Sequence, residues 1–437
     1  MTRQLRASVW NSLLAFKAQQ NGDPHTPKMA STLLSYVPLV NRLVGTDGTA
    51  REIKLEPVEV HNVETAAEKR PRTLKHLLRA NHVNHSIVYH DLQFDNHMAH
   101  ILCSAYLLGA DAAQLHHIYD VEAKELEPWQ DSPAEITKDD WRDFLGDKHY
   151  QRAYIDFFED NLAFDHAYDW KKVVAQYMFE GDEPLVNGLI GGLSHPLIHL
   201  GYAFEMDSRE IAIEALALAA VQHDHLHRYS DDPSYTKPAP FTSGSPAELV
   251  ERLAADKRFD GLFDEPGFVN IEPIFEKHEA LLLEYWNAWD LGDDPVARFR
   301  ESQELAVDLL TATVAPGTHS YNFFIVHLLT SSHAVRVLLP HAPVKFHVSL
   351  VRQWWLLVLA VYIAMLRPKI DREQVPVTTQ SWAYVEGQAL KSRFSTDAHF
   401  VKAVRSMKEA SRTWGDVHNR YLNAAVRFVD DFEGWVF

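Results

Sequence analysis

Cys103 is the only cysteine in the 437-residue chain, so no intramolecular disulfide can form. A chain without disulfides fits a reducing compartment, and we expect a cytoplasmic protein. Residues 1–20 contain only a short apolar stretch that polar residues interrupt, which is a poor match to a secretory signal peptide.

Long apolar runs are also missing. The longest one, Trp354 to Leu366, has 13 residues and lies between Arg352 and Arg367. A helix that crosses a membrane needs about 20 apolar residues. This run therefore predicts a buried core helix, and we expect a soluble protein with no membrane partner.

Positive charge is scarce, since 42 Lys and Arg stand against 60 Asp and Glu, for a formal net charge of -18. A protein of this charge repels phosphate backbones, so we do not expect nucleic acid as a partner. A chain of this length can bury a substantial core without structural metal or disulfides.

Several common catalytic motifs are absent. The sequence contains no GxGxxG, GxxxxGK[ST], GxSxG or HExxH pattern, and no Glu is followed three residues later by His. These absences disfavour a flavin or nicotinamide enzyme on a Rossmann sheet and a di-iron carboxylate bundle. If the protein oxidises a substrate, the expected agent is a mononuclear metal held mainly by histidine.

Apolar residues recur at helical spacing through most of the chain, whereas alternating strands with Asn-Gly or Asp-Gly turns are largely missing. We therefore predict an all-α fold, with a single large multi-helix domain over residues 1–437. The best examples of helical spacing are 211–226, 275–289, 302–314, 321–338 and 346–366.

The clearest interruption is the segment 229–246, which contains four prolines and one glycine and cannot form a regular helix. A loop of this length within a compact domain is often a lid or a binding loop. A plain surface connection is the alternative.

Histidines are plentiful, 25 in all, and two of them form an HxxxH pair in GGLSHPLIHLGYAFE. Pro196 is suited to the first position of a helix, so Ser194 or His195 is expected as its cap. His199 lies one turn after His195, and both imidazoles can point at one Zn, Fe or Cu ion. Alternatively, His195 and His199 are ordinary polar residues near the start of a helix and bind no metal.

Other histidines and one lysine stand in apolar surroundings. His97 and His100 open the helix of DNHMAHILCSAYLLGA, and His327 lies among apolar residues in FFIVHLLTSSH. Lys402 in DAHFVKAVR lies in an apolar helical stretch, where a buried lysine is costly unless it is paired or neutral. Alternatively, His327 is a hydrogen-bonded core histidine, and the side chain of Lys402 extends along its apolar neighbours until its amine reaches the surface.

A second HxxxH pair, His223 and His227, ends a predicted helix next to the proline-rich loop. Cationic side chains are favourable at helix C-termini, so we interpret this pair as an ordinary helix end.

The segments quoted above, together with DAHFVKAVR, resemble the questin oxidase-like family. The LLGA ending, the HPLIHLGYxxE run and the VHLLTSS run are the specific parts. They occur in order over residues 96–340, and DAHFVKAVR extends the resemblance to about residue 405. The resemblance thus covers most of the chain.

The resemblance implies an oxidoreductase of secondary metabolism that cleaves a ring of anthraquinone-type aromatic polyketides such as questin, with a Baeyer–Villiger-like outcome. The implied co-substrate is dioxygen. The implied cofactor is non-haem iron, as Fe2+, held by four histidines and a lysine carboxylated by carbon dioxide. Reduced nicotinamide, NADPH, is a further implied reductant.

Carried over residue by residue, His195 and His199 match the HPLIH pair and His327 matches the histidine before LLTSS. His97 and His100 both match the first motif, and the resemblance does not decide which one binds the metal. Lys402 is the expected carboxylated lysine, with Lys391 in GQALKSRF as the alternative. Asp95 stands where the family usually has a first histidine, which puts a role for that position in doubt.

Two other functions remain open. A zinc-dependent hydrolase or lyase would activate water, not oxygen, on a related metabolite. A non-enzymatic helical binding protein would use its histidines structurally and would bind no stoichiometric metal. Metal analysis and oxygen consumption separate the three hypotheses.

Overall fold

The computed structural model describes residues 51–315 and 317–437, so the prediction made for residues 1–20 lies outside the described part of the chain. In the described part nearly all regular structure is helical, and the strands form two small two-stranded sheets. The all-α prediction is therefore confirmed.

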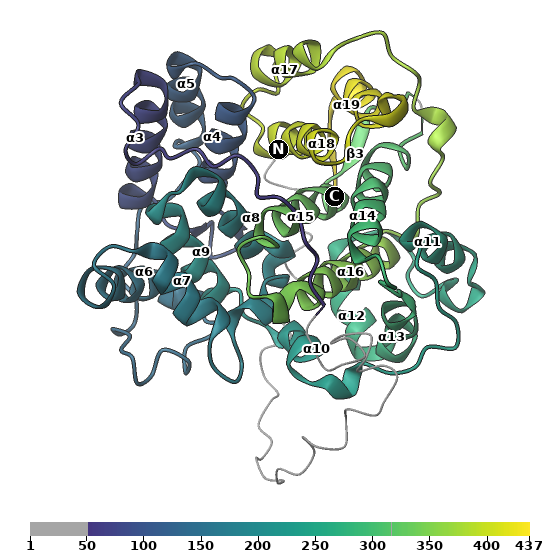
Figure 1. Ribbon diagram of the computed structural model, residues 1–437, viewed down its shortest axis with the longest axis horizontal. Helices are drawn as coiled ribbons and strands as arrows, with labels where there is room; N and C mark the ends of the chain where they lie inside the picture. Colours follow the sequence, from purple (N-terminus) through teal and green to yellow (C-terminus); the bar gives the residue numbers. More distant parts are fainter. Residues whose placement is uncertain (1–50, 316) are drawn as a thin grey trace.

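The first half of the described chain runs from α3 to α11, and the second half from α12 to α19 (Figure 1). The α-helices are α3 (Lys69–Asn84), α4 (Met98–Leu107), α5 (Ala112–Glu122), α6 (Gln151–Asp160), α7 (Trp170–Phe179), α8 (Gly191–Met206), α9 (Arg209–Val221), α10 (Arg228–Asp231), α11 (Pro246–Ala255), α12 (Ile271–Lys277), α13 (Glu279–Ala288), α14 (Pro295–Thr311), α15 (Ile325–Leu338), α16 (His347–Ala364), α17 (Trp382–Lys391), α18 (Ala398–Trp414) and α19 (Arg420–Asp431). The strands are β1 (Val88–Tyr89), β2 (Phe94–Asp95), β3 (Ser320–Asn322) and β4 (Gly434–Val436).

Five helices meet in the interior. Helix α8 packs against α9, α15 and α4, while α18 packs against α4 and α15 (Figure 1). Every residue of α15 is buried, as are nearly all residues of α8. Burial along nearly their whole length places α8 and α15 at the centre of the core.

The apolar run in α16 is the core helix that the sequence predicts. Residues 344–364 are long and apolar enough to cross a membrane, but 94% of the apolar window is buried within the protein. Trp354 and Trp355 are fully buried, and α16 packs against α12, α13 and α15. The indole N–H of Trp354 donates to the Leu328 carbonyl of α15, which satisfies the one polar atom of that side chain.

The short strands lie next to the starts of two core helices, α4 and α15. β1 and β2 pair antiparallel, with Val88 opposite Asp95, and lead directly into α4. β3 and β4 pair in parallel, with Ser320 opposite Gly434, so the end of the chain lies beside the entry to α15.

The proline-rich segment 229–246 forms only one helical turn at α10 and a short 3-10 turn at Pro233–Tyr235 before α11 begins. Tyr229 is buried and its hydroxyl donates to Glu279, so the start of the segment is anchored. The absence of a long regular helix there agrees with the sequence, and a lid function for this segment stays a prediction.

Candidate metal centre

Four histidine side chains converge where the interior helices meet. One ring nitrogen of each lies within 4.8 Å of the corresponding nitrogens of the others. We call this group the histidine cluster. Its members are His97 at the start of α4, His195 in α8, His327 in α15 and His399 in α18. Three of them are buried and His97 is half-buried.

The backbone bends sharply just before His195. Gly192, Leu193 and Ser194 have φ of 55°, 56° and 65°, so the regular helix begins only at His195 and Pro196, as the sequence predicts. The capping bond expected from Ser194 is not formed, since its hydroxyl has no partner in the described residues. A Cβ at Gly191 would lie 2.2 Å from the Gln222 carbonyl oxygen, so glycine is required where the end of α9 approaches this bend.

Carbonyl oxygens orient three of the four rings. The Nδ1 atom of His97 lies 2.7 Å from the Asp95 carbonyl oxygen, and that of His327 lies 2.9 Å from the Phe323 carbonyl oxygen. Nδ1 of His195 lies 2.5 Å from the Gly192 carbonyl oxygen. A carbonyl can only accept a hydrogen bond, so each Nδ1 carries the proton and each Nε2 presents a lone pair. This is the usual arrangement of metal-binding histidines.

The Nε2 atoms face one another. His97 Nε2 lies 2.9 Å from His195 Nε2, and His327 Nε2 lies 3.2 Å from His399 Nε2. The Nε2 atoms of His97 and His195 both present lone pairs, which repel each other unless both face one cation. Nitrogens about 2.1 Å from one ion lie at most about 4.2 Å apart, so the cluster needs only a slight contraction to hold a metal.

The cluster is held in the neutral form that metals bind. Burial, followed by the charge of Lys402, lowers the pKa of His97, His327 and His399 well below the usual value of 6.5. Burial also lowers the pKa of His195, although Asp95 opposes the shift. Neutral imidazoles bind a metal without first losing a proton.

Lys402 lies three residues after His399 on α18 and is fully buried. Its Nζ has no hydrogen-bond partner among the residues that the structure describes. Burial lowers the pKa of Lys402 to about 7, against the charges of Asp397 and Asp95. A buried, unpartnered amine is costly, so this position calls for a partner or a modification. Lys391, the alternative, is exposed at the end of α17.

Asp95, whose role the sequence leaves in doubt, supports the cluster. Its carbonyl oxygen accepts from His97, and its carboxylate lies 3.3 Å from His195 Nδ1. The amide of Gln222 donates to the same carboxylate at 2.7 Å. Asp95 therefore orients two members of the cluster without joining it.

His100 and His199, both expected as ligands, lie outside the cluster. His100 Nε2 is 3.1 Å from His199 Nδ1, and His199 Nε2 is 2.7 Å from a Glu214 carboxylate oxygen. Both ring nitrogens of His199 are thus engaged, because its ring turns toward α9. The structure separates the HPLIH pair and leaves His97, not His100, with the cluster.

His399 was not among the expected ligands. The available signal was its place three residues before Lys402, which puts both side chains on one face of α18. His223 and His227 stack on each other beyond the end of α9, with ring centroids 4.4 Å apart, and neither belongs to the cluster.

Comparison with known proteins gives a consistent result. The model of the questin oxidase-like family matches residues 94–407, which include the whole cluster and Lys402. The chain is 26% identical to a Baeyer-Villiger oxidase of Pestalotiopsis microspora, over 76% of this chain and 79% of that protein. It is 26% identical to a Baeyer-Villiger monooxygenase of Aspergillus aculeatus, over 87% and 84%. It is 29% identical to a questin oxidase of Aspergillus fumigatus, over 41% and 42%.

Proposed function

Because the chain belongs to the questin oxidase-like family, we propose that it is a metal-dependent oxygenase that cleaves a ring of an anthraquinone-type aromatic polyketide. The similar proteins are named oxidases and monooxygenases of the Baeyer-Villiger type, and one is named for questin, which supports an oxidoreductase. The metal, the oxygen and the substrate class are our inference.

One observation carries the proposal. His97 Nε2 and His195 Nε2 lie 2.9 Å apart, although carbonyl oxygens fix the proton of each ring on Nδ1. Two lone pairs at this distance are stable only around a cation. A structural role for these histidines would have placed a hydrogen-bond donor between them.

The four cluster histidines would hold the metal, which we assign as Fe2+. Imidazole suits Fe, Zn and Cu alike, so the assignment to iron depends on the proposed oxidation and not on the ligands. Bound iron would supply the activation of dioxygen. The protein would fix the ligands and exclude water, because three of the four imidazoles are buried and only His97 is half-buried.

Lys402 fits a fifth ligand after carboxylation. An ammonium beside a cation is repelled, whereas the carbamate formed with carbon dioxide is an anion that binds through oxygen. The buried Nζ without a partner is the atom that such a modification would satisfy.

Aromatic side chains lie beside the cluster. The ring of Phe323 packs on His399 with centroids 4.4 Å apart, and Phe437, which directly follows β4, packs on Phe323 at 4.6 Å. Phe437 is 46% exposed, so an aromatic surface runs from solvent to the cluster. A fused aromatic ring would find flat partners along this surface.

The test is metal analysis of the purified protein combined with oxygen consumption in the presence of an anthraquinone, with and without NADPH. We expect about one iron per chain and oxygen uptake that depends on the substrate. Zinc without oxygen uptake would support the hydrolase or lyase. Protein with no stoichiometric metal would support the binding protein.

A further inference from the structure

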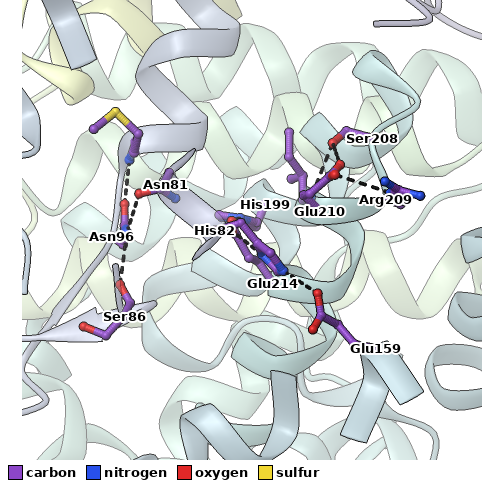
Figure 2. A network of polar contacts seen from close by, with 12 residues as sticks. Asn81, His82, Ser86, Asn96, Glu159, His199, Ser208, Arg209, Glu210 and Glu214 are labelled. Carbon is purple, nitrogen blue, oxygen red and sulfur yellow. Dashed lines mark hydrogen bonds and ion pairs between the residues drawn. The ribbon is translucent and has the colours of Figure 1, made fainter. Parts of the chain in front are cut away.

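A continuous row of polar side chains leads away from the histidine cluster, and the proposed mechanism does not use it. The four links measure 3.1, 2.7, 3.0 and 3.0 Å. The five groups belong to five different helices, and Figure 2 shows His82, His199 and Glu214 close together, with Glu159 joined to them by a dashed line. In order, the row consists of His100 (α4), His199 (α8), Glu214 (α9), His82 (α3) and Glu159 (α6).

The row joins the interior to the surface. The first four residues are at most 5% exposed, whereas the Glu159 side chain is 47% exposed. At the inner end, the His100 ring lies edge-on to His97 with centroids 5.2 Å apart. Among the described residues, the side chains of His199 and Glu214 make hydrogen bonds only to other members of the row.

Charge fixes the direction of every hydrogen bond. Burial alone would lower the pKa of His82, but bonds to Glu159 and Glu214 raise it to about 10. Burial would raise the pKa of Glu214, but bonds to His199 and His82 lower it to about 2. His82 is therefore an imidazolium that donates from both nitrogens, and Glu214 is a carboxylate that accepts from both sides.

The remaining protons follow from this pair. His199 Nε2 must carry a proton to donate to Glu214, so His199 Nδ1 accepts from His100 Nε2. His100 Nδ1 is then a bare lone pair, and it is fully buried with no partner among the residues that the structure describes. One acceptor thus remains open at the inner end of the row.

We propose that these five residues form a proton relay that carries a proton between a group bound at the histidine cluster and solvent at Glu159. This inference rests on the proposed function, because it assigns the proton that the reaction releases.

The transfer balances without any other reactant. A proton enters at His100 Nδ1, the Nε2 proton of His100 passes to His199 Nδ1, and the Nε2 proton of His199 passes to Glu214. His82 releases its Nε2 proton to Glu159, and Glu159 releases it to water. The His82–Glu214 ion pair becomes a neutral pair, so the buried row has the same net charge before and after. The row regains its starting tautomers when the same steps run in reverse and the proton returns to the group at the cluster, so the proton leaves and re-enters once in each turnover.

The chemistry at the inner end points to a phenolic hydroxyl of the substrate as the donor. Deprotonation makes an aromatic ring richer in electrons and easier to oxidise. Three of the four cluster histidines are buried, so solvent has little direct access to take up this proton. A fixed imidazole acceptor meets that need.

The first test is Glu214→Gln, which keeps the shape of the side chain and one acceptor oxygen but cannot take up a proton and pass it on. We expect kcat to fall about 100-fold, in the range of lost general acid–base catalysis, with unchanged metal content and KM. The solvent deuterium isotope effect on kcat should rise. Glu210→Gln is the matched control, because Glu210 is buried one turn earlier on α9 and is outside the row. A wild-type rate in Glu214→Gln would overturn the relay.

If Glu214→Gln does not fold, His82→Ala decides the question near the surface. Imidazole added to the buffer should restore part of the kcat lost in that variant, because it can occupy the vacated space and carry the proton. Lost activity that imidazole does not restore would overturn the relay.

A second readout needs no substrate. In protein with 15N-labelled histidine, NMR should show His100 protonated on Nε2 and bare on Nδ1. The Nε2 proton of His199 should exchange with solvent faster than its burial allows, and Glu214→Gln should slow this exchange. The opposite His100 tautomer, or exchange unaffected by Glu214→Gln, would overturn the relay. Failure of the wild-type protein to consume oxygen would instead count against the proposed function.

Discussion

The histidine cluster and the row from His100 to Glu159 are neighbouring groups that both contain buried histidines. They differ in what the ring nitrogens of these histidines contact. In the cluster, carbonyl oxygens occupy Nδ1 of His97, His195 and His327, and lone pairs face one another. In the row, both nitrogens of His199 and His82 are engaged, and carboxylates stabilise the protons. Burial alone therefore does not distinguish a ligand from a proton carrier, whereas the chemistry of the partner does.

The largest expected effect separates the two members of the HPLIH pair. His195→Ala should remove essentially all bound metal and turnover, because it deletes a cluster nitrogen. His199→Ala should lower metal affinity by at most about 10- to 100-fold, the usual cost of losing an outer partner. Elemental analysis of both variants measures the difference. Equal loss of metal in both would erase the distinction between cluster and row.

The next effect concerns the two lysines. Lys402→Ala should abolish turnover and weaken metal binding by more than about 100-fold, beyond the cost of an outer partner, because an anionic ligand would be lost. Lys391→Ala is the matched control and should leave both unchanged, since Lys391 is exposed at a helix end. Mass spectrometry under native conditions should show a carbon dioxide adduct that Lys402→Ala lacks. A wild-type rate in Lys402→Ala would rule out the carbamate.

Metal binding should stabilise the fold through the cluster and not through the row. Ferrous ion at about 100 times its Kd should raise the free energy of unfolding by about 2.7 kcal/mol. We expect His399→Ala to lose this gain and Glu214→Gln to keep it, as measured by urea unfolding under anaerobic conditions. A full metal-dependent gain in His399→Ala would remove that residue from the ligand set.

The smallest effect is the pH dependence that the row gives to the metal-free protein. The pKa of His82 is raised from 6.5 to about 10, so its stabilising contribution is complete below pH 6.5 and is lost as pH rises through 10. The pKa of Glu214 is lowered from 4.5 to about 2, so its contribution is complete above pH 4.5 and is lost as pH falls through 2.

Both contributions are therefore complete between pH 4.5 and 6.5. In this window Glu214→Gln should lower the free energy of unfolding by about 1–3 kcal/mol, the cost of a lost charged hydrogen bond. The difference from wild type should shrink as pH approaches 10. A difference that does not change with pH would mean that His82 is not charged by this pair.

Much of the fold could be predicted from the sequence because periodicity reports burial directly. The apolar run around Trp354 predicts α16, and Pro196 predicts where the regular part of α8 begins. Both depend on neighbouring residues alone, so they can be inferred without knowing which helices pack together.

The site could be predicted only in part, for a physical reason. His195 and His199 are one turn apart on α8, and spacing suggests that they share a target. The target of each ring depends on what the neighbouring helices offer, and α9 offers Glu214 to His199. His82 has no spacing signal that sets it apart from other helical histidines, and the one signal for His399 is its place three residues before Lys402. Their roles arise only when α18 and α3 are packed in place.

The cluster draws its first histidine from residue 97 and its last from residue 399. A growing chain therefore offers at most three of these imidazoles until α18 has left the ribosome. Metal acquired during synthesis would find an incomplete and exchangeable site. The complete site closes a loop of about 300 residues, so loading of the proposed metal would come at the final stage of maturation, after the last core helix has docked.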